Sequence, residues 1–386
     1  MLDTRLAFDV TAHTGTATIT FAPSAVPGAT LEIGDLAIDR ADVGYTAGVK
    51  LDLALPASDR PIAATIAFHY RLHDRFDGAS PGGFTMLWPD HCGDLFPCHS
   101  NPADGTTFSS VTLTGVPAGL TAVYPRAIPA DAPAYQLAWA IDAYTELPLG
   151  ATRAGTQVTI AYRAGELAAA QHGGAHLVAA FDWLEHTLGP YRYGAVVGGV
   201  SVAWPRGGLG GMEHHPRWHV AAAALADEVT HVHEAAHGWF GDGVRVACWE
   251  DFVLSEGTAS YLAGRALDVV APGVGAATWQ DYTSELAAVP GAKPVWPDSC
   301  GTVDVMELYT TAPYMRGAFF YRAVALKVGA DALDRALATF YAAHAGTSAR
   351  MRDVLATIRT VTGYDPTACA ETWLRATTTP APAPCP

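Results

Sequence analysis

The feature that most constrains this chain is the run His-Glu-Ala-Ala-His at 233–237, followed at a distance by Glu256. On a helix, residues i and i+4 lie on one face about one turn apart, so His233 and His237 can point their rings at one position. Two imidazoles and one carboxylate are the protein ligands of a catalytic zinc site whose fourth position is left to water. The spacing therefore predicts one zinc ion held by His233, His237 and Glu256, with Glu234 as the base that acts on the water.

A helix that merely carries two half-buried histidines is the alternative reading of this short motif. Three features favour the metal site. The helix is apolar around the histidines, at Val229, Val232 and Ala235, where unpaired polar groups would be costly. Glycines from Gly238 onward are typical of the end of a helix just after the second histidine. Glu256 then stands near the start of another helix-like segment.

Composition limits the class of protein. The chain has 386 residues, half of them apolar and 16% charged, which is typical of a globular protein of two or three domains. The formal net charge of −15 predicts that it binds no nucleic acid, because no basic stripe is present to neutralise phosphates. An acidic surface is compatible with a peptide substrate. The sequence predicts no particular oligomeric state.

The chain shows no export signal or membrane segment. The first ten residues lack the basic start and apolar run of a signal peptide. No apolar run reaches the roughly 18 residues of a spanning helix. We therefore expect a cytoplasmic protein that does not enter the membrane, with a trimmed, exported form as the alternative. Cys92 and Cys98 could form a disulfide in an exported protein, whereas reduced thiols are expected in the cytosol.

Hydrophobic periodicity predicts an α+β fold in consecutive parts. Residues 1–164 contain short alternating, β-branched segments separated by Pro and Gly, which predict an N-terminal antiparallel β-sheet domain. Residues 165–376 are mainly helical, beginning with one helix over 166–188, and form the predicted zinc-binding domain. Residues 377–386 are too rich in Pro to fold and are predicted to form a tail.

Four separated motifs make the chain resemble the gluzincin zinc aminopeptidases, the group of alanyl aminopeptidase and leukotriene hydrolase. Their H-E-x-x-H motif, eighteen residues and a Glu are matched at 233–256. Their G-x-M-E-N segment is similar to Gly210-Gly211-Met212-Glu213, although His214 stands in place of Asn. Their tyrosine motif is similar to Pro313-Tyr314-Met315-Arg316-Gly317, and a second tyrosine is matched by Tyr309. Phe84 to Cys98 resembles a segment of their β domain.

The resemblance implies a thermolysin-like catalytic domain and a role for each matched residue. Glu213 would bind the free α-ammonium of the substrate, and Gly210, Gly211 and Met212 would lie along the bound peptide. Tyr314 would donate a hydrogen bond to the oxyanion that forms during catalysis. Tyr309 and His214 would contact substrate. The alternatives are a solvated loop carboxylate for Glu213 and core packing for the two tyrosines.

The chain also departs from the family. Met86 occupies a place where relatives carry a Gln or Glu that helps to hold the substrate amine. Ala263 replaces an acid that usually stands seven residues after the third ligand, and the C-terminal helical domain of many relatives has no counterpart. Asp251 is a candidate for the group that orients one of the ligating histidines.

These patterns favour a zinc aminopeptidase. An endopeptidase or processing protease of the same fold, less dependent on a free N-terminus, is the first alternative. A peptide-binding module with a degenerate site is the second. A metal assay together with hydrolysis of aminoacyl substrates discriminates the second alternative from the two enzymes.

Overall fold

A computed structural model describes residues 1–74, 77–87, 90–204, 209–289, 291, 293–297, 300–301 and 307–386. Over these residues the chain divides into two compact units. The first unit contains 1–148, 159–170 and 192–225, and the second contains 149–158, 171–191 and 226–386. This division differs from the predicted boundary between residues 164 and 165, because residues 192–225 return to the first unit.

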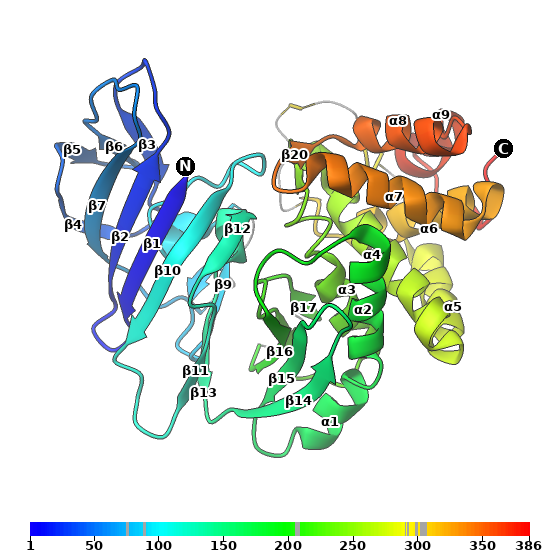
Figure 1. The fold of residues 1–386 in the computed structure, drawn as a ribbon, viewed down its shortest axis with the longest axis horizontal. Helices are drawn as coiled ribbons and strands as arrows, with labels where there is room; N and C mark the ends of the chain where they lie inside the picture. The colour runs from blue at the N-terminus through cyan, green and yellow to red at the C-terminus, as the bar shows by residue number, and fades with distance from the viewer. Residues whose placement is uncertain are drawn as a thin grey trace. The chain divides into compact units, whose positions relative to one another are not determined.

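The main sheet of the first unit explains the alternating pattern near the N-terminus. Its strands, in spatial order, are β12 (Ile128–Ala132), β10 (Thr106–Thr114), β1 (Asp3–Asp9), β2 (Thr14–Phe21), β7 (Ile62–His69) and β4 (Ala37–Ala41). Along β1, Leu6 and Phe8 are buried while Arg5 and Ala7 are exposed, which is the period-2 pattern of a strand with one face on a core. Figure 1 shows β1 and β10 side by side.

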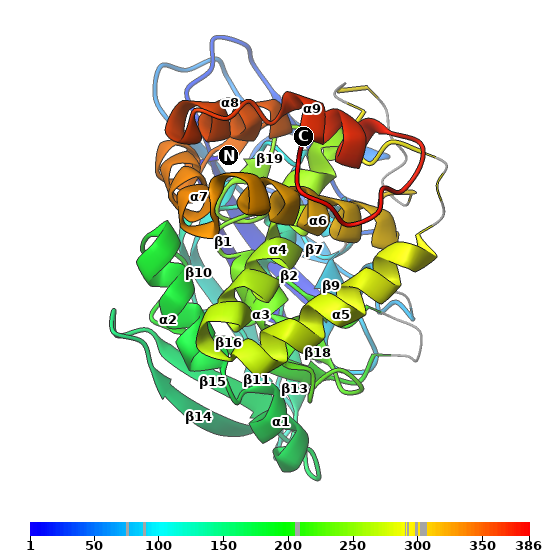
Figure 2. The ribbon, with the colours of Figure 1, turned by 90° about the vertical axis from the view of Figure 1, so that its right-hand side faces the viewer.

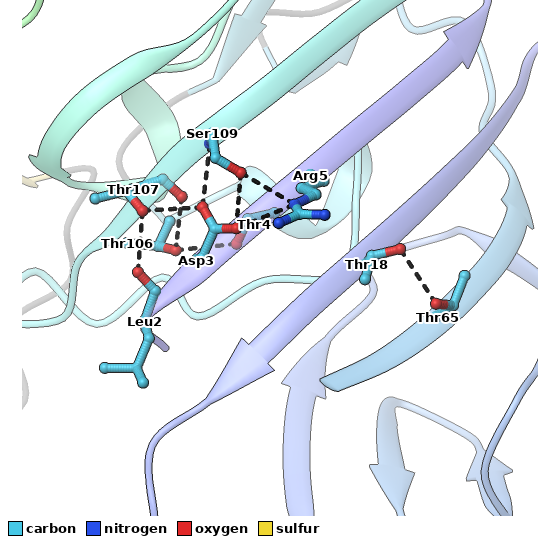
Figure 3. A network of polar contacts seen from close by, with 9 residues as sticks. All are labelled: Leu2, Asp3, Thr4, Arg5, Thr18, Thr65, Thr106, Thr107 and Ser109. Atoms are coloured by element: carbon cyan, nitrogen blue, oxygen red, sulfur yellow. Dashed lines mark hydrogen bonds and ion pairs between the residues drawn. The ribbon is translucent and has the colours of Figure 1, made fainter. Parts of the chain in front are cut away.

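The pairing of β1 with β10 is parallel, whereas β1 and β2 are antiparallel. A polar network holds the start of the parallel pair (Figure 3). The Asp3 carboxylate accepts hydrogen bonds from the Thr107 hydroxyl at 2.9 Å and from the Ser109 hydroxyl at 2.7 Å. These bonds lie beside the point where the register shifts between Thr4 and Arg5. A side chain of β1 therefore fixes a pairing between segments about a hundred residues apart.

The chain also forms smaller sheets. They are formed by β3 (Ala29–Glu32), β6 (Lys50–Leu53) and β5 (Tyr45–Ala47); by β8 (Asp77–Ala79) and β9 (Thr85–Leu87); by β11 (Thr121–Val123) and β13 (Ala140–Asp142); and by β14 (Thr145–Ala151), β15 (Gln157–Tyr162), β16 (Val196–Val202), β18 (His219–Ala221) and β17 (Gly211–Met212) in that order. Two short 3₁₀ turns, η1 (Cys92–Asp94) and η2 (Ala134–Gln136), lie between strands. The predicted α+β class, with an N-terminal β part and a helical part after it, is confirmed.

The second unit is built around α4 (Phe252–Val270). This helix contacts α3 (Glu228–Ala236), α5 (Pro272–Ala288) and α6 (Thr311–Val328), and Figure 2 shows it among them. Nearly every residue of α4 up to Leu267 is buried, including Ser255, Glu256 and Ser260. Polar side chains buried on a central helix need partners, so their position already indicates a site.

Further elements surround this group of helices. They are α1 (Leu167–Gly173), α2 (Leu177–Leu188), β19 (Arg245–Val246), η3 (Trp249–Asp251), α7 (Ala330–His344), β20 (Ser348–Ala349), α8 (Met351–Thr362), α9 (Thr367–Ala370) and η5 (Glu371–Arg375). The single helix predicted over 166–188 is two helices, because the chain turns at residues 174–176, where Gly174 directly follows Gly173. Two consecutive glycines weaken a helix enough to permit that break. Among the described helices, none combines the length and the apolar character needed to cross a membrane.

All six cysteines are paired, as Cys92–Cys98, Cys248–Cys300 and Cys369–Cys385. The third disulfide changes the interpretation of the C-terminus. Residues 377–386 form no helix or strand, as their Pro content predicted, but they are not a free tail. Cys385 is buried and its backbone N–H bonds Ala323 O at 3.4 Å. The chain end is therefore fixed to α6.

Free thiols provide a direct test of these pairings. We expect the freshly purified, denatured and unreduced protein to react with no equivalents of a thiol reagent, and the reduced protein to react with all six cysteines. Closing a loop of 52 residues by Cys248–Cys300 should stabilise the fold by about 4 kcal/mol through the entropy of the unfolded chain. Detection of two or more free thiols in protein that was never exposed to reductant would contradict the pairing.

Candidate metal centre

The helix with the first two predicted ligands has a well-defined start. The Asp227 carboxylate caps α3 by accepting hydrogen bonds from the backbone N–H groups of Val229 and Thr230, each at 3.2 Å. Asp is a favoured N-cap residue because it satisfies N–H groups that have no partner within the helix. In the first turn, Glu228 Oε2 lies 2.6 Å from the ring Nδ1 of His176 at the start of α2. The Asp227 cap fixes where the turns of α3 begin, and thereby where its histidines point.

The helix with the third ligand starts at a buried ionic cluster. Asp251, just before α4, is fully buried and contacts the guanidinium of Arg350. Its Oδ1 also accepts hydrogen bonds from Trp296 Nε1 at 2.7 Å and from Met351 N at 3.2 Å. The sequence suggested that Asp251 orients a ligating histidine, but its partners are these other groups. It ties the start of α4 to α8, one turn before Glu256.

The three predicted ligands converge on one position. His233 Nε2 lies 3.1 Å from Glu256 Oε2 and 3.1 Å from His237 Nε2, and the remaining pair, His237 Nε2 and Glu256 Oε2, is 3.3 Å apart. Tetrahedral zinc with bonds of about 2.0–2.1 Å requires donors about 3.3–3.4 Å from one another. The three donor atoms thus have the spacing of a zinc site.

Burial and charge suit the same site. The side chains of His237 and Glu256 are 1% and 6% exposed. Burial lowers the pKa of His233, so its ring is neutral and can act as a ligand at neutral pH. Burial alone would raise the pKa of Glu256, but the neighbouring His237 and His233 lower it below its ordinary value, so the carboxylate is charged.

The contacts of the outer ring nitrogens indicate which atom of each histidine would face a bound metal. His237 Nδ1 lies 3.0 Å from the backbone carbonyl of Phe240, which can only accept a hydrogen bond, and 3.3 Å from Ser255 Oγ. His233 Nδ1 lies 3.4 Å from Ser260 Oγ. A proton on each Nδ1 leaves the lone pair on Nε2, where the three donors meet. Sequence reasoning missed both serines, although their place one residue before and four residues after Glu256 is a usable signal.

The two catalytic candidates lie beside these ligands in the second unit. Glu234 is 5% exposed, and one of its carboxylate oxygens is within 4.8 Å of a ring nitrogen of His237. The ring of Tyr314, in the first turn of α6, stacks on that of His233 with centroids 5.9 Å apart. Tyr314 is partly exposed, so core packing does not account for it fully. Tyr309 is also partly exposed and packs edge-on against Phe252 at 5.4 Å, and its contact with substrate remains a prediction.

The predicted substrate residues of the first unit lie on two short strands and the turn after one of them. Gly211 and Met212 form β17, which pairs antiparallel with β18; the backbone carbonyl of Gly210 accepts a hydrogen bond from Ala221 N at 2.9 Å. Glu213 follows β17 directly and is 5% exposed. In the order of the described strands, β17 is the last of its sheet. A strand at the edge of a sheet can pair with an extended peptide.

His214 and Met86 are both buried in the first unit. His214 Nε2 accepts a hydrogen bond from the backbone N–H of Leu87, next to Met86 on β9, at 3.5 Å. Its ring also meets that of His219 edge-on at 4.8 Å. Burial and the neighbouring His219 lower the pKa of His214, so the ring is neutral. These contacts describe a packed histidine, and a contact between His214 and substrate remains a prediction.

Part of this chain matches known peptidases in sequence. Residues 215–373 match the model of the peptidase family M1 domain. Aminopeptidase N of Streptomyces lividans is 28% identical over 161 residues, which are 40% of this chain and 19% of the relative. Leucine aminopeptidase 2-1 of Meyerozyma guilliermondii is 25% identical over 292 residues, 68% of this chain and 45% of the relative. The chain thus spans less than half the length of these two curated relatives.

Solved structures share the whole fold. The M1 zinc metallopeptidase of Deinococcus radiodurans has a TM-score of 0.82 at 22% identity, covering 99% of this chain and 95% of that one. A variant of that protein bound to a Tyr-Ser-Ala substrate has a TM-score of 0.84 at 21% identity. The chain thus shares the fold of these zinc metallopeptidases, and its second unit brings two histidines and one glutamate together as a candidate metal centre. The match of residues 215–373 to the peptidase family M1 domain agrees with the resemblance that the motifs indicated.

Proposed function

We propose that this protein is a zinc-dependent aminopeptidase that binds a single ion through His233, His237 and Glu256. The observation that carries the proposal is the convergence of these three donor atoms at the mutual spacing of tetrahedral zinc. Bound zinc supplies a Lewis acid that polarises the scissile carbonyl and makes a water molecule acidic enough to lose a proton near neutral pH.

The remaining chemistry belongs to side chains of the chain itself. Glu234, close to His237, accepts the proton of the attacking water and passes it to the leaving amine. The hydroxyl of Tyr314, whose ring stacks on His233, donates to the carbonyl oxygen as negative charge develops on it. Glu213 binds the α-ammonium of the substrate, and the edge of β17 from Gly210 to Met212 pairs with the peptide backbone.

An endopeptidase remains the second candidate because of Met86. The family that the sequence resembles carries a Gln or Glu at this position, whereas the Met86 side chain is 1% exposed and offers no charge-assisted hydrogen bond to an amine. One such bond contributes about 1.5–3 kcal/mol, so its absence weakens capture of a free N-terminus by about tenfold to a hundredfold. Weak capture would relax the requirement for that N-terminus.

Paired peptides with free and acetylated N-termini separate the two candidates. We expect the zinc-loaded protein to shorten the free peptides one residue at a time and to leave the acetylated peptides intact, as read by mass spectrometry. Removal of zinc by a chelator should abolish cleavage, and added zinc should restore it. Internal cleavage of acetylated peptides would favour the endopeptidase. Cleavage of neither series by protein that contains zinc would contradict both.

The disulfides also bear on where the protein works. Reducing compartments keep thiols unpaired, whereas all six cysteines of this chain are paired. We propose an oxidising compartment, in place of the cytoplasm expected from the sequence. This proposal can be tested by recovering the protein from the culture medium and from the cell extract of the native host. The N-terminal sequence of the protein is then determined for both fractions.

A further inference from the structure

The helix that carries Tyr314 is held on two nearly opposite faces. Tyr314, Gly317 and Tyr321 are spaced i, i+3 and i+7, so they share the face of α6 that meets α4. Tyr314 meets Phe252 edge-on at 6.1 Å, and Tyr321 Oη accepts a hydrogen bond from Thr258 Oγ1 at 2.8 Å. Arg316, Phe319 and Ala323 have the same spacing two residues further on, which places them about 200° around the helix. A segment that packs on this second face therefore lies on the side of α6 opposite to α4.

The second face is covered by the last twenty residues of the chain, Thr367–Pro386, which we call the C-terminal strap. The rings of Phe319 and Trp373 are stacked, with centroids 5.9 Å apart and an angle of 16° between planes. Cys385 N bonds Ala323 O, and the Cys369–Cys385 disulfide closes the strap on itself. Figure 2 shows the red end of the chain passing along α6.

Arg316 joins the strap to the helix. It is 1% exposed, and its guanidinium donates to three backbone carbonyls: Nε to Trp373 O at 2.7 Å, Nη2 to Ala376 O at 2.7 Å, and Nη1 to Lys293 O at 3.2 Å. Trp373 and Ala376 lie at the end of η5, where backbone carbonyls lack partners within the turn and carry partial negative charge. The planar guanidinium can reach all three carbonyls at once, which a lysine ammonium on its flexible stem cannot do.

We propose that Arg316 is a positioning residue for Tyr314, and that it acts by pinning the C-terminal strap against the face of α6 opposite the metal ligands. The inference rests on the proposed function, because it assigns Tyr314 the role of oxyanion donor. Arg316 lies two residues from Tyr314 in the first two turns of α6, so a change in the contacts of Arg316 shifts the position of the Tyr314 hydroxyl. Displacement of a catalytic group by about 1 Å can lower turnover about a hundredfold.

The test is a double-mutant cycle between Arg316→Lys and Tyr314→Phe. We expect Arg316→Lys to lower kcat by about tenfold to a hundredfold with KM and zinc content unchanged. The reason is that the substitution displaces only the Tyr314 hydroxyl, which donates its hydrogen bond in the transition state. In the Tyr314→Phe background the same substitution should have no further effect on kcat, since the group that it positions is gone. Arg322→Lys is the matched control: it lies on the same helix, stacks on Trp279 at 4.2 Å, and should leave kcat unchanged.

The outcomes separate the inference from the proposed function. A kcat for Arg316→Lys equal to that of the wild type, or a loss that multiplies with that of Tyr314→Phe, would overturn the role of Arg316 alone. Full turnover by Tyr314→Phe would overturn the proposed role of the phenol, and this inference with it. If Arg316→Lys does not fold, Trp373→Leu replaces it, because this substitution loosens the strap from the other side. We expect Trp373→Leu to lower kcat by the same factor in the wild-type background and to have no effect on kcat in the Tyr314→Phe background.

Discussion

Glu234→Gln should lower kcat about 10²- to 10⁴-fold while the protein keeps its zinc, because the amide has the shape of the carboxylate but cannot accept a proton. Glu234 is not one of the three converging donors, so zinc binding does not depend on it. It is nevertheless buried beside His237, where a general base must lie. Zinc content by mass spectrometry and kcat on an aminoacyl substrate, measured on the same preparation, give the comparison.

The control for this variant is Glu228→Gln, the same change on the same helix. Glu228 contacts His176 at the start of α3, and a glutamine there can still accept that hydrogen bond. We expect its kcat to match the wild type. Wild-type turnover by zinc-loaded Glu234→Gln would refute the assignment of the base and require another group to take the proton.

Gly317→Ala should have the second large effect, on both stability and kcat, because α4 and α6 contact each other at a pair of glycines. A Cβ added to Gly257 would lie 2.7 Å from the Cα of Gly317, and one added to Gly317 would lie closer still to the Cα of Gly257. Backbone cannot move aside as a side chain can. We expect the free energy of unfolding to fall by about 1–3 kcal/mol from overpacking. Because the crossing sets the separation of Glu256 from Tyr314, kcat should also fall, by about a hundredfold.

Gly273→Ala provides the contrast for this crossing. Gly273 lies in the first turn of α5, where an added Cβ would have nothing within 4 Å. This substitution should raise the free energy of unfolding by about 0.5–1 kcal/mol, the usual preference of a helix for Ala over Gly. Thermal unfolding and kcat of the two variants, measured together, show whether the loss comes from the crossing. An unchanged kcat in Gly317→Ala would show that α6 tolerates a shift.

Sequence reasoning located the three converging donors because their constraint is local. The i, i+4 spacing of His233 and His237 fixes their common face, and Asp227 with Glu228 gives a recognisable helix start. The β pattern near the N-terminus was equally readable, since alternation follows from one buried face. The pairing of β1 with β10 could not be predicted, because the partners of Asp3 lie beyond residue 100 and no local signal links them.

The residues missed at the site are those whose partners are distant in sequence. Asp251 bonds Arg350 and Met351, about a hundred residues away, so its role could not be inferred from the nearby histidines. Arg316 was visible only as part of a motif, because its carbonyl partners come from the end of the chain. The C-terminal strap was misjudged for a related reason: Pro-rich composition indicates a lack of helix or strand, but a disulfide to Cys369 can still fix such a segment.

The oxygens beside the outer ring nitrogens of the two predicted histidine ligands are uncharged, a carbonyl for His237 and a hydroxyl for His233. An acid in either place would push electron density through the imidazole towards the ion. With neutral acceptors, a zinc ion bound there would keep more of its own positive charge. It should therefore draw electrons from a bound carbonyl more strongly, and also exchange with external zinc more quickly, than an ion backed by an acid. A centre of this kind gains reactivity at the expense of retention.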